Sequence, residues 1–168
     1  TASFLLTRQS LVFEHNGCAF SRENIMAITD IGEGTKDGDD DKIGRFGVGF
    51  KAVFAYSETP RIWSPTFSFM ISDLVLPSQI DPVLDLGKNT RFEFPFNNPK
   101  KPCDIAFSEI NACLTEFAET TLLFLTHLES INWEIEDTLG GQERRVWHLD
   151  NHFEVLKQVG GKTTKSSH

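Results

Sequence analysis

Three glycines ahead of an apolar, helix-like run constrain this chain more than any other feature. The run from Ile43 to Phe54 reads IGRFGVGFKAVF, and its apolar spacing after the last glycine predicts a helix from Phe46 to about Tyr56. The glycines are Gly44, Gly47 and Gly49. Glycine lets main-chain N–H groups approach an anion, and the first turn of a helix attracts negative oxygens. We interpret the segment as a phosphate cradle, and a helix entry without a ligand is the structural alternative.

The spacing of these glycines differs from that of the two commonest phosphate-binding loops. It runs G-x-x-G-x-G, whereas the dinucleotide fingerprint runs G-x-G-x-x-G after a strand and the P-loop ends in Gly-Lys-Ser/Thr. The sequence also lacks the protein-kinase stretches H-R-D and D-F-G. A different class of nucleotide or phosphate site is therefore expected.

Four motifs in order carry a resemblance to a known family. They are HNG at 15–17, IGEGTK at 31–36, DGDDD at 37–41 and IGRFGVGF at 43–50. This order resembles the GHKL or Bergerat-fold ATPase domain of DNA gyrase, the large heat-shock chaperone, histidine kinases and MutL, and it is most similar to the heat-shock chaperone and sacsin-type ATP-binding domains. The resemblance implies an α/β two-layer sandwich, with a mostly antiparallel mixed sheet and helices on one face. It also implies a nucleotide-gated lid within a larger chaperone-like or defence-like ATPase.

The resemblance further implies which residues bind ATP or ADP. The base-side positions are His15, Asn16, Gly17 and, in the stretch GKNTRF, Thr90. The lid, at about 33–43, contributes Thr35 and Lys36. The phosphate cradle comprises Gly44, Gly47, Val48, Gly49, Phe50 and Lys51. For His15, Thr90 and the two lysines, ordinary structural or solvated roles are the alternatives.

His15 departs from the family pattern. Many relatives carry an aspartate at this position, which accepts a hydrogen bond from the adenine amino group. A neutral histidine accepts through one ring nitrogen only in the matching tautomer, and Asn16 offers an amide oxygen instead. The residue type therefore leaves base selectivity open.

The residues expected to cleave a nucleotide are missing from the sequence. In relatives a glutamate and a magnesium-binding asparagine, as E-x-x-x-N or E-x-x-D-N, lie on a helix before the strand that ends in N-G, and the stretch before His15 holds no such motif. Hydrolysis needs a placed base and magnesium. We assign no catalytic and no metal-binding residue, and we expect an N-terminally truncated or degenerate domain with little or no turnover. Magnesium is expected only with the upstream helix, and a non-catalytic interaction module is the alternative function.

Composition predicts a single domain at 1–158 and a disordered polar tail at 159–168. The 168 residues are 39% hydrophobic, without a run of 18 apolar residues, so we expect a cytoplasmic protein with no membrane partner. The net charge of −8 argues against a nucleic-acid surface. The expected partners are ATP and other domains of a larger protein.

Two smaller features have structural interpretations. The acidic run at 37–41 is typical of a solvated loop, with calcium binding as the alternative, although the run lacks the later glutamate of an EF-hand. The cysteines Cys18, Cys103 and Cys113 are odd in number and widely spaced. We therefore expect buried or half-buried thiols rather than disulfides or a metal site.

Patterning along the chain predicts the secondary structure. A hairpin is expected at 3–8 and 11–15, strands at 61–64 and 67–72, a loop at 76–88 and a strand at 90–96. Ser21 is expected to cap one helix, with Ile25 and Ile28 facing inward, and Asp104 another. A C-terminal hairpin is expected at 131–136 and 144–149, with its turn at Gly140 and Gly141.

Overall fold

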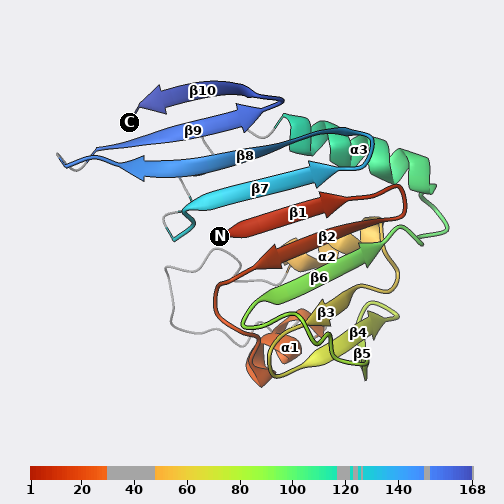
Figure 1. Cartoon of the computed structure of the whole chain (residues 1–168). Coiled ribbons are helices and arrows are strands. Elements are labelled where there is room, and N and C mark those ends of the chain that lie inside the picture. The colour runs from red at the N-terminus through yellow and green to blue at the C-terminus, as the bar shows by residue number, and fades with distance from the viewer. Residues whose placement is uncertain (30–47, 117–121, 123–124, 126, 150–151, 168) are drawn as a thin grey trace.

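The computed structural model describes residues 1–29, 48–116, 122, 125, 127–149 and 152–167. Over these residues the protein is an α/β structure with a mixed sheet of ten strands and few helices (Figure 1). The strand order is β10-β9-β8-β7-β1-β2-β6-β3-β4-β5. Neighbouring strands are antiparallel except for β1 and β7, which run parallel.

Strands β1 (Ala2–Leu6) and β2 (Ser10–His15) form the predicted N-terminal hairpin at the centre of this sheet. β2 also pairs with β6 (Thr90–Pro95), which places His15 opposite Thr90. Side chains directly opposite each other in an antiparallel pair lie on the same face. The register therefore brings together two positions, 75 residues apart in the sequence, that the sequence predicted to lie on the base side of the site.

The other strands extend the sheet in both directions. Beyond β6 lie β3 (Arg61–Trp63), β4 (Ser68–Ser72) and β5 (Leu76–Gln79). Beyond β1 lie β7 (Ser130–Ile135), β8 (Thr138–Trp147), β9 (Phe153–Val159) and β10 (Lys162–Ser167). The strand β5 corrects the prediction of a loop throughout 76–88, because its four exposed residues have no apolar alternation that patterning could detect.

The described helices are α1 (Arg22–Thr29), α2 (Val48–Lys51), the 3-10 helix η1 (Ala52–Ala55) and α3 (Cys103–Thr115). The cap of α1 is as predicted, since Ser21 Oγ accepts from the Asn24 N–H and Asn24 Oδ1 accepts from the Ser21 N–H. The cap predicted for α3 is wrong, because Pro102 occupies the N-cap and Asp104 lies inside the first turn. None of the helices in the described ranges is long and apolar enough to cross a membrane.

The buried side chains form two clusters. The aromatic cluster consists of Phe54, Ile62, Phe69, Ile71, Phe92 and Phe94. The central cluster consists of Leu6, Phe96, Ala106, Phe107, Leu114, Leu122, Ile131, Trp133, Ile135 and Val155. Leu11 packs against both. α1 and α2 contribute only partly buried side chains to the aromatic cluster, whereas η1 contributes the buried Phe54 and α3 contributes buried side chains to the central cluster.

The C-terminal hairpin turns earlier than predicted. Its turn lies at Glu136 and Asp137, where Asp137 has a φ of 60°, and the two glycines at 140 and 141 lie inside β8. A Cβ on Gly141 would lie 2.2 Å from the Trp133 ring. These glycines therefore allow close packing against β7 rather than a turn.

Two further predictions fail at the surface. The tail predicted to be disordered instead pairs with β9 as β10, through a turn at Gly160 and Gly161 with φ of 54° and 79°. All three cysteine residues are exposed, not buried, and none forms a disulfide. Cys103 Sγ still hydrogen-bonds to the Phe96 carbonyl.

Candidate functional site

His15 ends β2 on the face that carries the aromatic cluster. Its ring lies 5.6 Å from the Phe13 ring and 5.9 Å from the Phe92 ring, centroid to centroid. The Gly17 N–H donates to His15 Nδ1 at 3.1 Å, which closes a tight turn through Asn16. Asn16 and Gly17 are exposed, and His15 is half-buried. The predicted HNG element is therefore a strand end with its imidazole held by its own turn.

Thr90 lies opposite His15 and is fully buried. Its hydroxyl is 3.2 Å from Ser64 Oγ on the segment after β3, and Ser64 Oγ also accepts from the Phe20 N–H at 2.9 Å. This short network joins three segments under the His15 turn. Sequence reasoning did not single out Ser64, because an isolated serine after a strand carries no distinguishing pattern.

The described end of the glycine motif packs against the same aromatic side chain as His15. Phe50, at the end of the motif, has its ring 6.4 Å from that of Phe92 and 6.2 Å from that of Phe54. Gly49 is exposed, and an added Cβ there would meet no described atom within 4 Å. Val48 and Lys51 bound the short helix α2. Phe92 thus joins the base-side half and the cradle half of the predicted site.

A hydrogen-bonded clamp holds the helix that follows the glycine motif. Asn98 Nδ2 donates to the Phe54 carbonyl at 2.8 Å, at the end of η1. Tyr56 donates its hydroxyl to Glu109 of α3, and Lys101 Nζ lies 2.5 Å from the same carboxylate. The hydrogen bonds from Lys101 and Tyr56 lower the pKa of Glu109. The β6–α3 connection and α3 therefore fix the position of η1.

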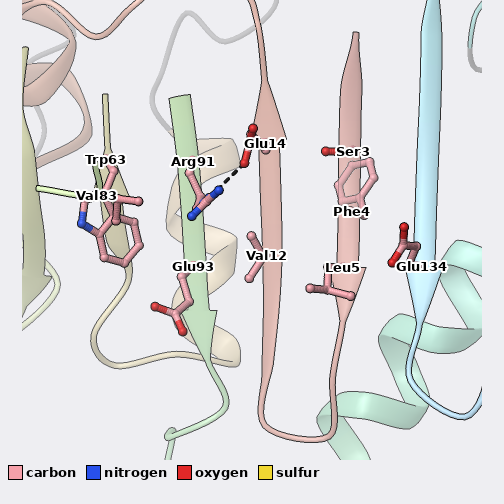
Figure 2. A pocket seen from close by; sticks show the side chains of 10 residues that line it. All are labelled: Ser3, Phe4, Leu5, Val12, Glu14, Trp63, Val83, Arg91, Glu93 and Glu134. Atoms are coloured by element: carbon pink, nitrogen blue, oxygen red, sulfur yellow. Dashed lines mark hydrogen bonds and ion pairs between the residues drawn. The ribbon is translucent and has the colours of Figure 1, made fainter. Parts of the chain in front are cut away.

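The opposite face of the same strands carries a different chemistry. A groove of about 470 Å³ crosses β3, β6, β2, β1 and β7, and Figure 2 shows Glu14 and Arg91 pointing toward each other within it. Glu14 accepts from Arg91 Nε at 2.9 Å and from Asn89 Nδ2 at 2.7 Å. Sequence reasoning placed no functional residue here, because alternating polar side chains on a strand are typical of a solvated face.

Burial and hydrogen bonding shift the two neighbouring groups on β2 for different reasons. Burial lowers the pKa of His15 below its ordinary value of 6.5, which favours the neutral imidazole. Burial opposes the ionised form of Glu14, but the hydrogen bonds from Asn89 and Arg91 outweigh it and lower the pKa of this carboxyl. At neutral pH the sheet face that carries the aromatic cluster therefore presents a neutral imidazole. The opposite face, which we call the open face, presents the Glu14–Arg91 ion pair.

Several predicted residues lie outside the described residues. They are Thr35, Lys36, Gly44 and Gly47, together with the lid at about 33–43. Their roles stay predictions. Among the residues that the structure describes, no group of three or more His, Cys, Asp or Glu side chains could hold a metal ion.

Comparison with known proteins agrees with the N-terminal motifs. Residues 6–79 match the Sacsin domain model. The chain is also similar to Protein NO VEIN from Arabidopsis thaliana, at 31% identity over 166 residues, and to Sacsin from Homo sapiens, at 37% identity over 191 aligned residues. These alignments cover 83% and 89% of this chain but only 6% and 4% of the two relatives. The chain thus resembles a small part of much longer, sacsin-like proteins.

Proposed function

We propose that this chain is the nucleotide-binding domain of a larger sacsin-like protein, with the Bergerat-type arrangement of helices on one sheet face and with ATP or ADP as the implied nucleotide. The observation that carries the proposal is the position of Phe92. Its ring contacts both His15 at the end of β2 and Phe50 at the end of the glycine motif. Two motifs separated in the sequence therefore meet on one aromatic side chain, which supports a nucleotide site built from both of them.

In this proposal the two halves perform different tasks. The HNG turn, with Thr90 and Ser64 beneath it, faces the base, and the main-chain N–H groups of the glycine motif face the phosphates. The acidic segment at 33–43 acts as a lid. The nucleotide shifts the lid toward its closed form only by the difference between its affinities for the closed and the open form. The domain holds a nucleotide in the cytoplasm and couples its binding to neighbouring domains, with little hydrolysis by this chain alone.

Calorimetric titration of the 168-residue chain tests nucleotide binding directly. ATP, ADP and a non-hydrolysable ATP analogue are titrated with and without magnesium. We expect saturable binding at millimolar or lower nucleotide concentration and a weak effect of magnesium, because no magnesium ligand is assigned. Absence of binding by every purine nucleotide at millimolar concentration would overturn the proposal.

Substitution at Gly49 separates a ligand effect from a folding effect. An alanine Cβ there meets no described neighbour, and alanine favours a helix over glycine by about 1 kcal/mol. Gly49→Ala should therefore keep or raise the melting temperature while it weakens nucleotide binding at least tenfold, because the Cβ blocks close approach of a phosphate. Ser108→Ala, at an exposed position of α3, is the matched control and should leave binding unchanged.

A second candidate function is a non-catalytic interaction module. The groove on the open sheet face favours it, because Leu5 is 42% exposed there beside the Glu14–Arg91 pair. Its occupant would be another domain of the same long protein. In that case Gly49→Ala would leave function unchanged, and Leu5→Asp, on the open face, would abolish association with the neighbouring domain.

A further inference from the structure

We propose that the pocket between η1 and α3 is a docking site for one aromatic or branched aliphatic side chain of a neighbouring domain. The inference goes beyond the proposed nucleotide site, because no nucleotide is needed to fill this pocket. It shares with the proposed function only the premise that other domains of a sacsin-like protein surround this one.

The pocket lies where the two buried clusters meet, and it has a volume of about 200 Å³. Leu11 of β2, which packs against both clusters, and Phe94 of β6 line it from the sheet. Val53 of η1 and Ile110 of α3 line it from the two helices, and both are half-buried. Ala52, at the start of η1, also lines the pocket and is exposed. Its short side chain therefore leaves the pocket accessible from the surface.

Polar contacts beside the pocket fix the two helical segments in place. Tyr56, which also lines the pocket, donates its hydroxyl to Glu109 of α3 at 2.9 Å, and Lys101 Nζ lies 4.3 Å from the centroid of the Tyr56 ring. Asn98 holds the end of η1 through the Phe54 carbonyl. These contacts connect η1 to α3 and to the segment before it. The pocket is therefore formed before anything enters it, and little ordering opposes docking.

The lining of the pocket selects an uncharged apolar group. Every lining side chain is apolar except for the Tyr56 hydroxyl, and that hydroxyl already donates to Glu109. A charged or hydrogen-bonding group placed here would lose its bonds to water without gaining a partner. Water is also poorly held, because an ordered water needs several polar partners.

The volume fits one side chain better than a free ligand of ordinary size. Pockets for drug-sized molecules measure about 300–1,000 Å³, whereas an apolar cavity of about 150 Å³ accommodates a benzene ring. A single ring buries little area and binds weakly by itself. A covalent link to a neighbouring domain raises its effective concentration to about millimolar, which is enough to occupy a weak site. The relatives leave ample room for such a domain, since this chain covers only 6% and 4% of them.

Titration with N-acetyl-phenylalanine amide, one side chain on a capped residue, tests the pocket in the 168-residue chain without nucleotide. The methyl groups of Leu11, Val53 and Ile110 report on the pocket in carbon-13 NMR spectra. We expect saturable shifts confined to the methyl groups around the pocket, with a dissociation constant on the order of 1 mM. N-acetyl-glycine amide, which has the same backbone and no side chain, is the control and should cause no shift there.

A substitution that fills the pocket provides the second measurement. Ala52→Leu places a larger side chain in the pocket and should weaken binding of N-acetyl-phenylalanine amide at least tenfold. Ala55→Leu is the matched control, because Ala55 is an exposed alanine of η1 that does not line the pocket, and it should leave binding unchanged. Circular dichroism checks that both variants fold. The shifts in the unmodified chain decide the question even if Ala52→Leu does not fold.

Four outcomes would overturn the inference, whatever the nucleotide titrations show. They are the absence of saturable shifts by about 10 mM probe, tenfold above the expected dissociation constant, equal shifts with N-acetyl-glycine amide, and equal binding by Ala52→Leu and the unmodified chain. The fourth is binding of benzene without binding of N-acetyl-phenylalanine amide, which would mean that the pocket takes a free hydrocarbon and not a side chain.

Discussion

Helices α1 and α3 pack against side chains of the same sheet but stabilise it to different extents. α3 buries Ala106, Phe107 and Leu114 in the central cluster, whereas no residue of α1 is buried. The surrounding side chains also differ. Leu6 and Ile131 in the central cluster are at most 2% exposed, whereas Phe13 and Phe20, which pack against the aromatic cluster, are only half-buried. The helix beside the candidate site, α1, is thus the less tightly packed of the two.

This difference has a physical consequence for function. Regions with few buried apolar contacts open locally at lower free energy than the core. A ligand that binds only the ordered form of such a region stabilises it. We infer that the central cluster is the scaffold, and that α1 and the half-buried side chains around the aromatic cluster are the part in which the proposed nucleotide would change local order.

The largest expected effect is a difference in the free energy of unfolding between substitutions on α3 and on α1. Phe107→Ala should lower the free energy of unfolding by about 3–5 kcal/mol, as for a buried core phenylalanine. Ile25→Ala, in the partly exposed face of α1, should lower it by only about 1 kcal/mol. Urea denaturation followed by circular dichroism measures both, and equal losses would contradict the comparison.

Replacing a glycine with alanine should change the stability in opposite directions in the two regions. Gly141→Ala places a Cβ 2.2 Å from the Trp133 ring, and such overpacking costs about 1–3 kcal/mol. Gly49→Ala meets nothing in the described structure and should stabilise by up to about 1 kcal/mol through helix propensity. Thermal melting of the two variants beside the unmodified chain checks the signs. A destabilising Gly49→Ala would show that the aromatic region is packed as tightly as the scaffold.

Loss of the hydrogen bond between Asn98 and the end of η1 should have a moderate effect on stability, confined to the region around η1. Asn98→Ala removes the donor to the Phe54 carbonyl and should cost about 1 kcal/mol. Amide hydrogen exchange should become faster in η1 but remain unchanged in β7. Asn111→Ala, at a half-buried position of α3 where its Oδ1 accepts from the Thr115 hydroxyl within the same helix, should stay within about 0.5 kcal/mol. Uniformly faster exchange throughout the sheet would argue against a local clamp.

The smallest expected effect is the dependence of stability on pH. The pKa of His15 is lowered on folding, so below about 6.5 the unfolded chain takes up a proton that the folded chain resists. His15 should therefore reduce stability as the pH falls from 6.5, whereas Glu14, whose folded pKa also lies below its ordinary value, should do so only at lower pH. His15→Asn should flatten the profile between pH 6.5 and 5 in urea titrations, and Glu14→Gln should not.

Apart from β5, the sequence predicted the chain up to the end of β6 better than the part that follows it. The hairpin of β1 and β2, the cap of α1 and the alternating Phe92, Phe94 and Phe96 all follow from local patterns that the structure confirms. Its errors concern glycines and polar strands. The pair at 140 and 141 serves packing against Trp133, whereas the pair at 160 and 161 forms a turn. A Gly-Gly dipeptide between two extended runs was a hairpin signal that sequence reasoning overlooked.

The sequence by itself determined which residue types make up the candidate site and on which local elements they lie. These are an imidazole at a strand end and glycines before a helix. Tertiary structure decided what these residues contact. The β2–β6 register places Thr90 beside His15, and Phe92 joins His15 to Phe50. The same structure directs the Gly17 N–H onto His15 Nδ1. A sequence specifies its donors and acceptors, but only packing in three dimensions orients them.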